Sequence, residues 1–132
     1  MNQVDFVCDD GTTSLLLLCR NPGDLSAPAE SIRLRVQCSD CVAGLTVDAH
    51  SFAGFLDMFD NPPAIVEDSQ QWVASAGEWR LTIDRIAKGF RFTSQIDSLL
   101  DIHRWKLETS FEMNETCFNK LQIDVRQFIG AV

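Results

Sequence analysis

The chain lacks a long run of apolar residues, and this absence excludes a class of proteins. The longest run, Leu15 to Cys19, has the length of a strand and falls far short of the ~20 residues that a membrane-spanning helix needs. The first residues, MNQVDFVCDDG, are acidic and contain no apolar core, so we expect no secretory signal peptide. We therefore expect a cytoplasmic protein. At 132 residues, the chain is expected to form one domain over residues 1–132.

Motifs for nucleotide binding and nucleophilic catalysis are also absent. The chain contains neither GxGxxG nor GxxxxGK[ST], whose backbone N–H groups hold phosphates, and it has no GxSxG motif. Its two histidines, His50 and His103, lie outside any such motif, and its 19 acidic residues offer too many pairs to indicate a glycosidase. The sequence thus predicts no catalytic residue and no cofactor, and we expect a protein that is not an enzyme.

A pair of cysteines is the strongest candidate for chemistry. Cys38 and Cys41 form "CSDC", a spacing found in dithiol redox sites and in half of many zinc sites. A redox pair usually opens a helix, whereas this pair lies between two strand patterns, and no second CxxC could complete a zinc site. We expect a hairpin turn and no metal. A small enzyme that uses Cys38 and Cys41, or a metal or redox protein that uses them, remains an alternative hypothesis. An enzyme could instead use the residues around Asp101 and His103.

Basic residues are scarce in the first part of the chain. The net charge is −8; residues 1–78 carry 12 acids and 3 arginines (3 − 12 = −9), and residues 79–132 carry 7 acids and 8 bases (8 − 7 = +1). Phosphate contacts come from Lys and Arg, and anionic lipid repels acidic surfaces. We therefore expect no nucleic acid and no membrane as partner, but a basic protein.

Alternation of apolar and polar residues predicts strands. In "SIRLRVQC", Ile32, Leu34 and Val36 point to one side while Arg33 and Arg35 point to the other. Less regular strand patterns occupy residues 4–8 and 14–19, and the same alternation recurs in residues 43–50, 78–84, 89–96 and 105–113. Such alternation is typical of an antiparallel sheet with one covered face, and Lys88-Gly89 predicts a tight turn between two strands.

Two segments predict helices. Residues 51–59 repeat phenylalanine and leucine at helical spacing, with Ser51 as N-cap and Asn61-Pro62-Pro63 as the end. Residues 114–130 begin at the N-cap Asn114 and end at Gly130, and their apolar stripe is Phe118, Leu121, Val125, Phe128 and Ile129. The predicted fold class is α+β: an antiparallel sheet, either open or curled into a sandwich, with two amphipathic helices packed against it.

The segment "DNPPAIVEDSQQW" is the candidate binding site. It is predicted as a long loop that combines Ile65 and Val66 with acids and ends in an aromatic residue, and such loops often carry function. Trp72 could anchor a partner or, if "QQWVAS" is a strand, belong to the core. The predicted binding residues are Asp57, Asp60, Glu67, Asp68 and Trp72.

The order of these segments resembles a family of bacterial proteins. From residue 51 onward, the Phe-rich helix, the loop that ends in Trp72, the strands around Trp79 and Trp105 and the closing helix resemble WapI-type immunity proteins of polymorphic toxin systems. The resemblance implies that the protein neutralises a toxin by binding it. The acidic charge of residues 1–78 adds the hypothesis that this toxin is a basic nuclease and that an acidic face of the protein occludes its active or substrate-binding surface. A structural or adaptor domain that forms a homodimer is the other alternative, and the sequence leaves the oligomeric state open.

Overall fold

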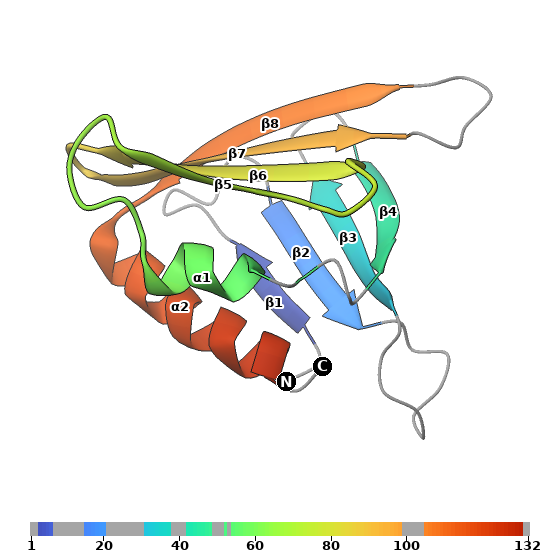
Figure 1. The fold of residues 1–132 in the computed structure, drawn as a ribbon, viewed down its shortest axis with the longest axis horizontal. Helices are drawn as coiled ribbons and strands as arrows, with labels where there is room; N and C mark the ends of the chain where they lie inside the picture. Colours follow the sequence, from blue (N-terminus) through green and yellow to red (C-terminus); the bar gives the residue numbers. More distant parts are fainter. Residues whose placement is uncertain are drawn as a thin grey trace.

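In this computed structural model, the described residues form two four-stranded antiparallel sheets and two helices (Figure 1). Placement is described for residues 3–6, 15–20, 31–37, 42–48, 52, 54–98 and 105–130. The first sheet has the order β1 (Gln3–Phe6), β2 (Leu15–Arg20), β3 (Ser31–Gln37), β4 (Val42–Asp48), and the second has β5 (Ser69–Val73), β6 (Trp79–Ile86), β7 (Gly89–Asp97), β8 (Lys106–Met113). Helix α1 (Phe55–Asp60) follows the first sheet and α2 (Glu115–Gly130) follows the second. The predicted α+β class is confirmed, with the strands divided between two sheets.

Alternation in the sequence corresponds to burial in the strands. In β3, Ile32, Leu34 and Val36 are buried while Arg35 is exposed. The strands β6 and β7 repeat this pattern, with mainly apolar side chains on the inner face and charged or polar side chains on the outer face. Ser94 of β7 is the exception: it is buried on the inner face, where its hydroxyl accepts a 2.9 Å hydrogen bond from the indole N–H of Trp79. Each sheet therefore covers the core with one face, because burying its apolar side chains removes them from water.

The two sheets and the helices share one core. The ring of Phe6 in β1 lies 5.9 Å from that of Phe92 in β7 and 5.8 Å from that of Phe59 in α1, measured between centroids. The strands of the two sheets cross one another, and both helices lie on the same side of the second sheet as β1 (Figure 1). Packing of this kind fixes α1 between the sheets' aromatic residues, and α1 in turn sets where the following loop begins.

Helix α2 follows its prediction. The backbone N–H of Cys117 donates to the Oδ1 of Asn114 at 2.8 Å, which is the N-cap interaction. The predicted apolar stripe faces the core, and the ring of Phe118 stacks on Phe90 of β7 at 4.0 Å. The turn before β7 also agrees, since Gly89 has a φ of 144° and a Cβ there would collide with the carbonyl oxygen of Met113.

Helix α1 is shorter than predicted. It begins at Phe55, and the residue before it, Gly54, has a φ of 82° and offers no side-chain cap. A left-handed residue cannot continue an α-helix, so the N-cap of α1 is Gly54 and not the predicted Ser51, which itself lies outside the described residues. Phe52 is nevertheless buried, and its ring lies 5.0 Å from that of Phe55. The end is as predicted, because Asn61 caps the helix with its N–H donated to the carbonyl of Asp57 at 2.9 Å.

Candidate functional site

The predicted long loop is divided into a shorter loop and a strand. Residues 61–68 connect α1 to β5, and Ser69–Val73 pair antiparallel with β6, where Trp72 lies opposite Leu81. The prediction of a loop that reaches Trp72 is therefore wrong for its last third. Glutamines are poor indicators of a strand, and here the pairing with β6 decides the conformation.

Trp72 belongs to the aromatic core, the second of the two roles considered for it. Only 7% of the residue is exposed. Its ring centroid lies 5.2 Å from Phe52, 4.9 Å from Phe55 and 5.1 Å from Trp79. The side chain therefore fixes β5 on α1 and on β6. In this structure its ring does not stand at the surface as an anchor for a partner.

Residues 65–68 form a tight turn, which we call the tip. The N–H of Asp68 donates to the carbonyl of Ile65 at 3.0 Å, and Glu67 has a φ of 80°. These features place Glu67 at the third position of a type II turn, where Gly is favoured. Two further bonds tie the tip to β6: the N–H of Glu67 donates to the carbonyl of Arg85 at 3.3 Å, and the N–H of Arg85 donates to the carbonyl of Asp68 at 2.9 Å.

Two exposed apolar side chains lie in the tip, and a third lies at the far end of β5. Ile65 is 64% exposed and Val66 is 55% exposed, while Val73 of β5 is 39% exposed. In the part of the chain that the structure describes, Ile123 of α2, at 55%, is the other large apolar residue with comparable exposure. Single exposed apolar residues are common on any protein. Two adjacent ones on a hydrogen-bonded turn are a stronger indication of a contact surface.

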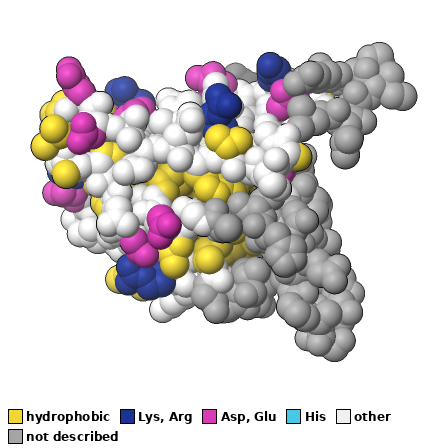
Figure 2. All heavy atoms as spheres, in the orientation of Figure 1, with side chains coloured by type: hydrophobic (Ala, Val, Ile, Leu, Met, Phe, Trp, Pro, Cys, Tyr) yellow, Lys and Arg dark blue, Asp and Glu magenta, His cyan; other side chains and the backbone are white. Residues whose placement is uncertain are grey.

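The predicted acidic residues do not form one cluster. Glu67 and Asp68 lie in the tip, exposed and without an ion-pair partner among the described residues, whereas Asp57 and Asp60 lie on α1. Asp60 accepts a 2.6 Å ion pair from Arg126 of α2, so its charge is compensated. Figure 2 shows acidic and hydrophobic side chains beside one another at the left end of the molecule, where the loop between α1 and β5 lies in Figure 1.

Acidic residues, without basic ones, also lie before and after the tip in the sequence. Residues 54–78 contain five acids (Asp57, Asp60, Glu67, Asp68 and Glu78) and no Lys or Arg. Basic side chains on the neighbouring strands of the second sheet are paired with acids: Arg85, whose backbone holds the tip, pairs with Glu115 at 2.9 Å, and Arg91 pairs with Glu112 at 3.3 Å. The tip therefore combines exposed apolar surface with negative charge that no basic side chain of the described residues compensates, and it includes two of the five predicted binding residues.

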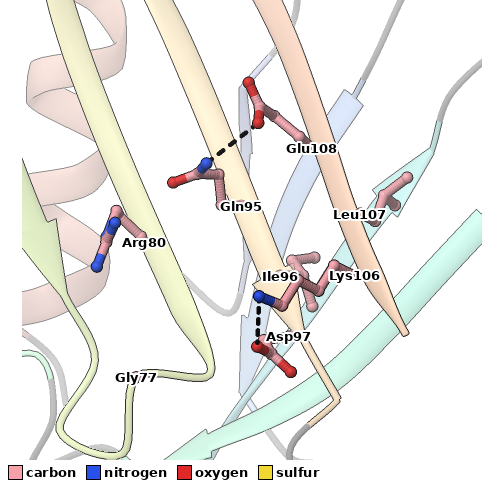
Figure 3. A pocket seen from close by; sticks show the side chains of 8 residues that line it. All are labelled: Gly77, Arg80, Gln95, Ile96, Asp97, Lys106, Leu107 and Glu108. Carbon is pink, nitrogen blue, oxygen red and sulfur yellow. Dashed lines mark hydrogen bonds and ion pairs between the residues drawn. The ribbon is translucent and has the colours of Figure 1, made fainter. Parts of the chain in front are cut away.

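A second candidate is a hollow of about 310 Å³ on the outer face of the second sheet (Figure 3). In this hollow the side-chain amide of Gln95 donates to Glu108 at 3.1 Å, and the ammonium of Lys106 lies 3.8 Å from the carboxylate of Asp97. With Arg80 added, the hollow holds two cations and two anions. Such a balance selects no ligand by its charge, and the hollow gives weaker support for a site than the tip does.

Several sequence candidates lie outside the described residues. These are Cys38 and Cys41 of "CSDC", His50, Asp101 and His103. Within the described residues, no group of three His, Cys, Asp or Glu side chains is placed to hold a metal. No helix in this part of the chain is long and apolar enough to cross a membrane.

Comparison with known proteins identifies a fold and no family. No family model matches the chain, and no curated protein matches it. Among solved structures, the chain is similar to the plant transcriptional regulator PBF-2, with a TM-score of 0.55 and 11% sequence identity over 99% of this chain and 82% of that one. At this identity the similarity concerns the fold alone: this chain shares the arrangement of sheets and helices of that plant regulator.

Proposed function

We propose that this protein binds a basic partner protein and neutralises it, as immunity proteins neutralise toxins. The observation that carries the proposal is the tip, where Ile65 and Val66 are exposed beside the carboxylates of Glu67 and Asp68, which pair with no cation of the described residues. Protein interfaces commonly have an apolar centre and a polar rim. The tip has both parts within one turn, and hydrogen bonds to Arg85 hold it in place.

Each part of the tip has a distinct role in binding. The two aliphatic side chains supply apolar area that a partner can cover, which favours association by about 25 cal/mol per Å² before the entropic costs of binding. The carboxylates attract basic groups over a distance and so increase the association rate. With no Lys or Arg between residues 54 and 78, this attraction is not opposed by neighbouring positive charge in the sequence.

The proposed mechanism is occlusion of a substrate surface. A nuclease presents Lys and Arg side chains to phosphates. Carboxylates of the tip, with Asp57 on α1, would occupy those groups in place of phosphates and block access to the substrate. This agrees with the resemblance to WapI-type immunity proteins. The role in transcription named for PBF-2 belongs to that protein, and a net charge of −8 disfavours phosphate binding by this one.

The proposal is tested by capture and inhibition. The immobilised protein is exposed to native lysate at low and at high salt, and any captured protein is identified and assayed for nuclease activity with and without the free protein. We expect a basic protein whose capture weakens with salt, because screening reduces attraction between exposed charges. We also expect its activity to fall as the free protein is added.

A charge-reversed variant provides the control for location. Glu67→Lys combined with Asp68→Lys should reduce capture at low salt, whereas Glu108→Lys on the outer face of the second sheet should leave capture unchanged. Capture of no partner, or of a partner that is equally retained by both variants, would contradict the proposal.

A further inference from the structure

We propose that the partner is held by strand addition: an extended basic segment of it pairs with the open edge of the second sheet at β5. This inference rests on the proposed function, because it assigns the way in which the partner protein is bound. The second sheet has the order β5-β6-β7-β8, so among the described residues β5 has a neighbouring strand on one side only. Strand addition uses the N–H and C=O groups that such an edge leaves unpaired.

The hydrogen bonds at both ends of β5 show which of its groups face outward. At one end the carbonyl of Asp68 accepts from the N–H of Arg85 at 2.9 Å, and at the other the N–H of Ala74 donates to the carbonyl of Trp79 at 2.9 Å. In an antiparallel pair, alternate residues direct both backbone groups to the neighbouring strand. The backbone N–H and C=O groups of the even-numbered residues of β5 therefore point toward β6. The backbone groups of the intervening residues point away from it, and these residues are Ser69, Gln71 and Val73.

The side chains around this edge leave it accessible. Ser69, Gln70, Gln71 and Val73 are all exposed, and Trp72 is the buried member of the strand. The amide of Gln71 donates to the hydroxyl of Thr82 at 3.3 Å on the outer face, so this side chain lies over β6. Trp72 meanwhile packs toward α1 through its contact with Phe55. Among the described residues, no hydrogen-bond partner is found for the outward backbone groups.

The opposite edge of the same sheet differs in charge. β8 carries Lys106, Glu108 and Glu112, whereas β5 contains no charged residue and no proline. Charged side chains and proline on an edge strand discourage pairing with another chain. β8 therefore has the protection that β5 lacks, and β5 is the edge of this sheet that an added strand would join.

The surroundings of β5 define the chemistry of the added segment. Its N-terminal end follows directly on Glu67 and Asp68, and its C-terminal end carries the exposed apolar side chain of Val73. No Lys or Arg lies between residues 54 and 78, so basic side chains on the added strand meet no repulsion from this segment. A strand that alternates basic and apolar residues fits this edge, because successive side chains point to opposite faces of a sheet.

A short peptide of alternating lysine and valine residues tests the edge directly. We expect it to bind in a fluorescence titration and to slow hydrogen exchange at the amides of Ser69, Gln71 and Val73, while the amide of Trp72 is protected with or without peptide. Two N-methylated forms serve as controls, each methylated on alternate backbone nitrogens. The form methylated at the pairing nitrogens should bind at least about tenfold more weakly, a difference of about 1.4 kcal/mol, and the other should bind as the parent does.

A proline variant tests the same edge from the protein side. Gln71→Pro removes an N–H that points away from β6, so no bond of the ladder is lost, and peptide binding should fall at least about tenfold with the urea midpoint nearly unchanged. The matched control is Glu108→Pro on β8, opposite Gln95, which should leave peptide binding unchanged. If Gln71→Pro does not fold, the N-methylated peptides decide the question without it.

The outcomes separate this inference from the proposed function. No binding of the peptide, equal binding of both N-methylated forms, or protection of amides elsewhere would overturn strand addition at β5. A partner captured from lysate equally well by the wild type and by Gln71→Pro would also overturn it, while leaving the proposed function in place. Failure to capture any partner would contradict the proposed function, and the peptide titration would still decide whether β5 accepts a strand.

Discussion

The two parts of residues 65–73 differ in solvent exposure, although each contains apolar residues beside polar ones. At the tip, Ile65 and Val66 are exposed on a turn whose third residue, Glu67, has a positive φ. Seven residues after Ile65, Trp72 is 7% exposed and surrounded by three aromatic rings. The comparison teaches that apolar composition alone does not separate a residue that stabilises the fold from one that is available for binding.

Backbone conformation explains how one short segment contains both a residue that stabilises the fold and residues that are available for binding. A non-glycine residue in the left-handed region costs roughly 1–3 kcal/mol, and Glu67 occupies that region. The aromatic contacts of Trp72 offset such a cost, since aromatic pairs contribute about 0.5–1.5 kcal/mol beyond the burial of their area. The core end of the segment thus holds the exposed end in a fixed shape.

The largest expected effect is at the core end. Trp72→Ala should lower the free energy of unfolding by about 3–5 kcal/mol, because it removes a large buried ring and leaves a cavity. Urea denaturation followed by circular dichroism measures this change. The neighbouring Val73→Ala, at an exposed position of the same strand, should cost less than about 1 kcal/mol. Equal losses from the two variants would show that the contrast between the two ends is wrong.

The next largest effect is a loss of affinity for the partner, and it is expected at the exposed tip. Ile65→Ser together with Val66→Ser should weaken the captured partner's affinity by about 10- to 100-fold, since apolar residues at the centre of an interface carry much of its energy. Stability should change little, because both side chains are already in water. Ile123→Ser on α2 is the matched control, since Ile123 is as exposed as Val66, both at 55%. Calorimetric titration measures the affinities, and an equal loss in the control would remove the tip from the interface.

Glu67→Gly separates the effect of the backbone conformation of the tip on stability from the effect of its charge on binding. Glycine tolerates a φ of 80°, so the variant should be more stable by up to about 1 kcal/mol. Its partner binding should weaken and lose part of its salt dependence, because one carboxylate is missing. Urea denaturation and salt-dependent titration report the two properties separately. A variant that is both less stable and unchanged in binding would contradict the described turn and the role of Glu67 together.

The smallest expected effect distinguishes the two acidic residues of α1, Asp60 and Asp57. Asp60→Asn should lower the unfolding free energy by no more than about 1 kcal/mol, the usual range for a surface ion pair, because Asp60 meets Arg126 at 2.6 Å. Asp57→Asn on the same helix should have no measurable effect, since Asp57 has no ion-pair partner among the described residues. Adding salt should reduce the loss seen for Asp60→Asn. A larger loss from Asp57→Asn would reverse these assignments.

Much of the fold was predictable because its signals are local. Alternation around Ile32, Leu34 and Val36 predicted the buried face of β3, and helical spacing after the N-cap Asn114 predicted α2 and its apolar stripe. Less of the candidate site was predictable. Glu67 and Asp68 stand where the loop was expected, but the start of α1 was misplaced because the left-handed backbone of Gly54 is not visible in a pattern of phenylalanines.

The sequence by itself determined which residues prefer the interior, where turns fall and that residues 54–78 carry five acids without a base. These properties depend on neighbours within a few positions along the chain. Only the tertiary structure decided that Trp72 lies inside, that Asp60 pairs with a residue 66 positions away and that β5 is an open edge without charge. The physical reason is that burial, ion pairing and the position of a strand within a sheet depend on contacts between residues that are distant in the sequence.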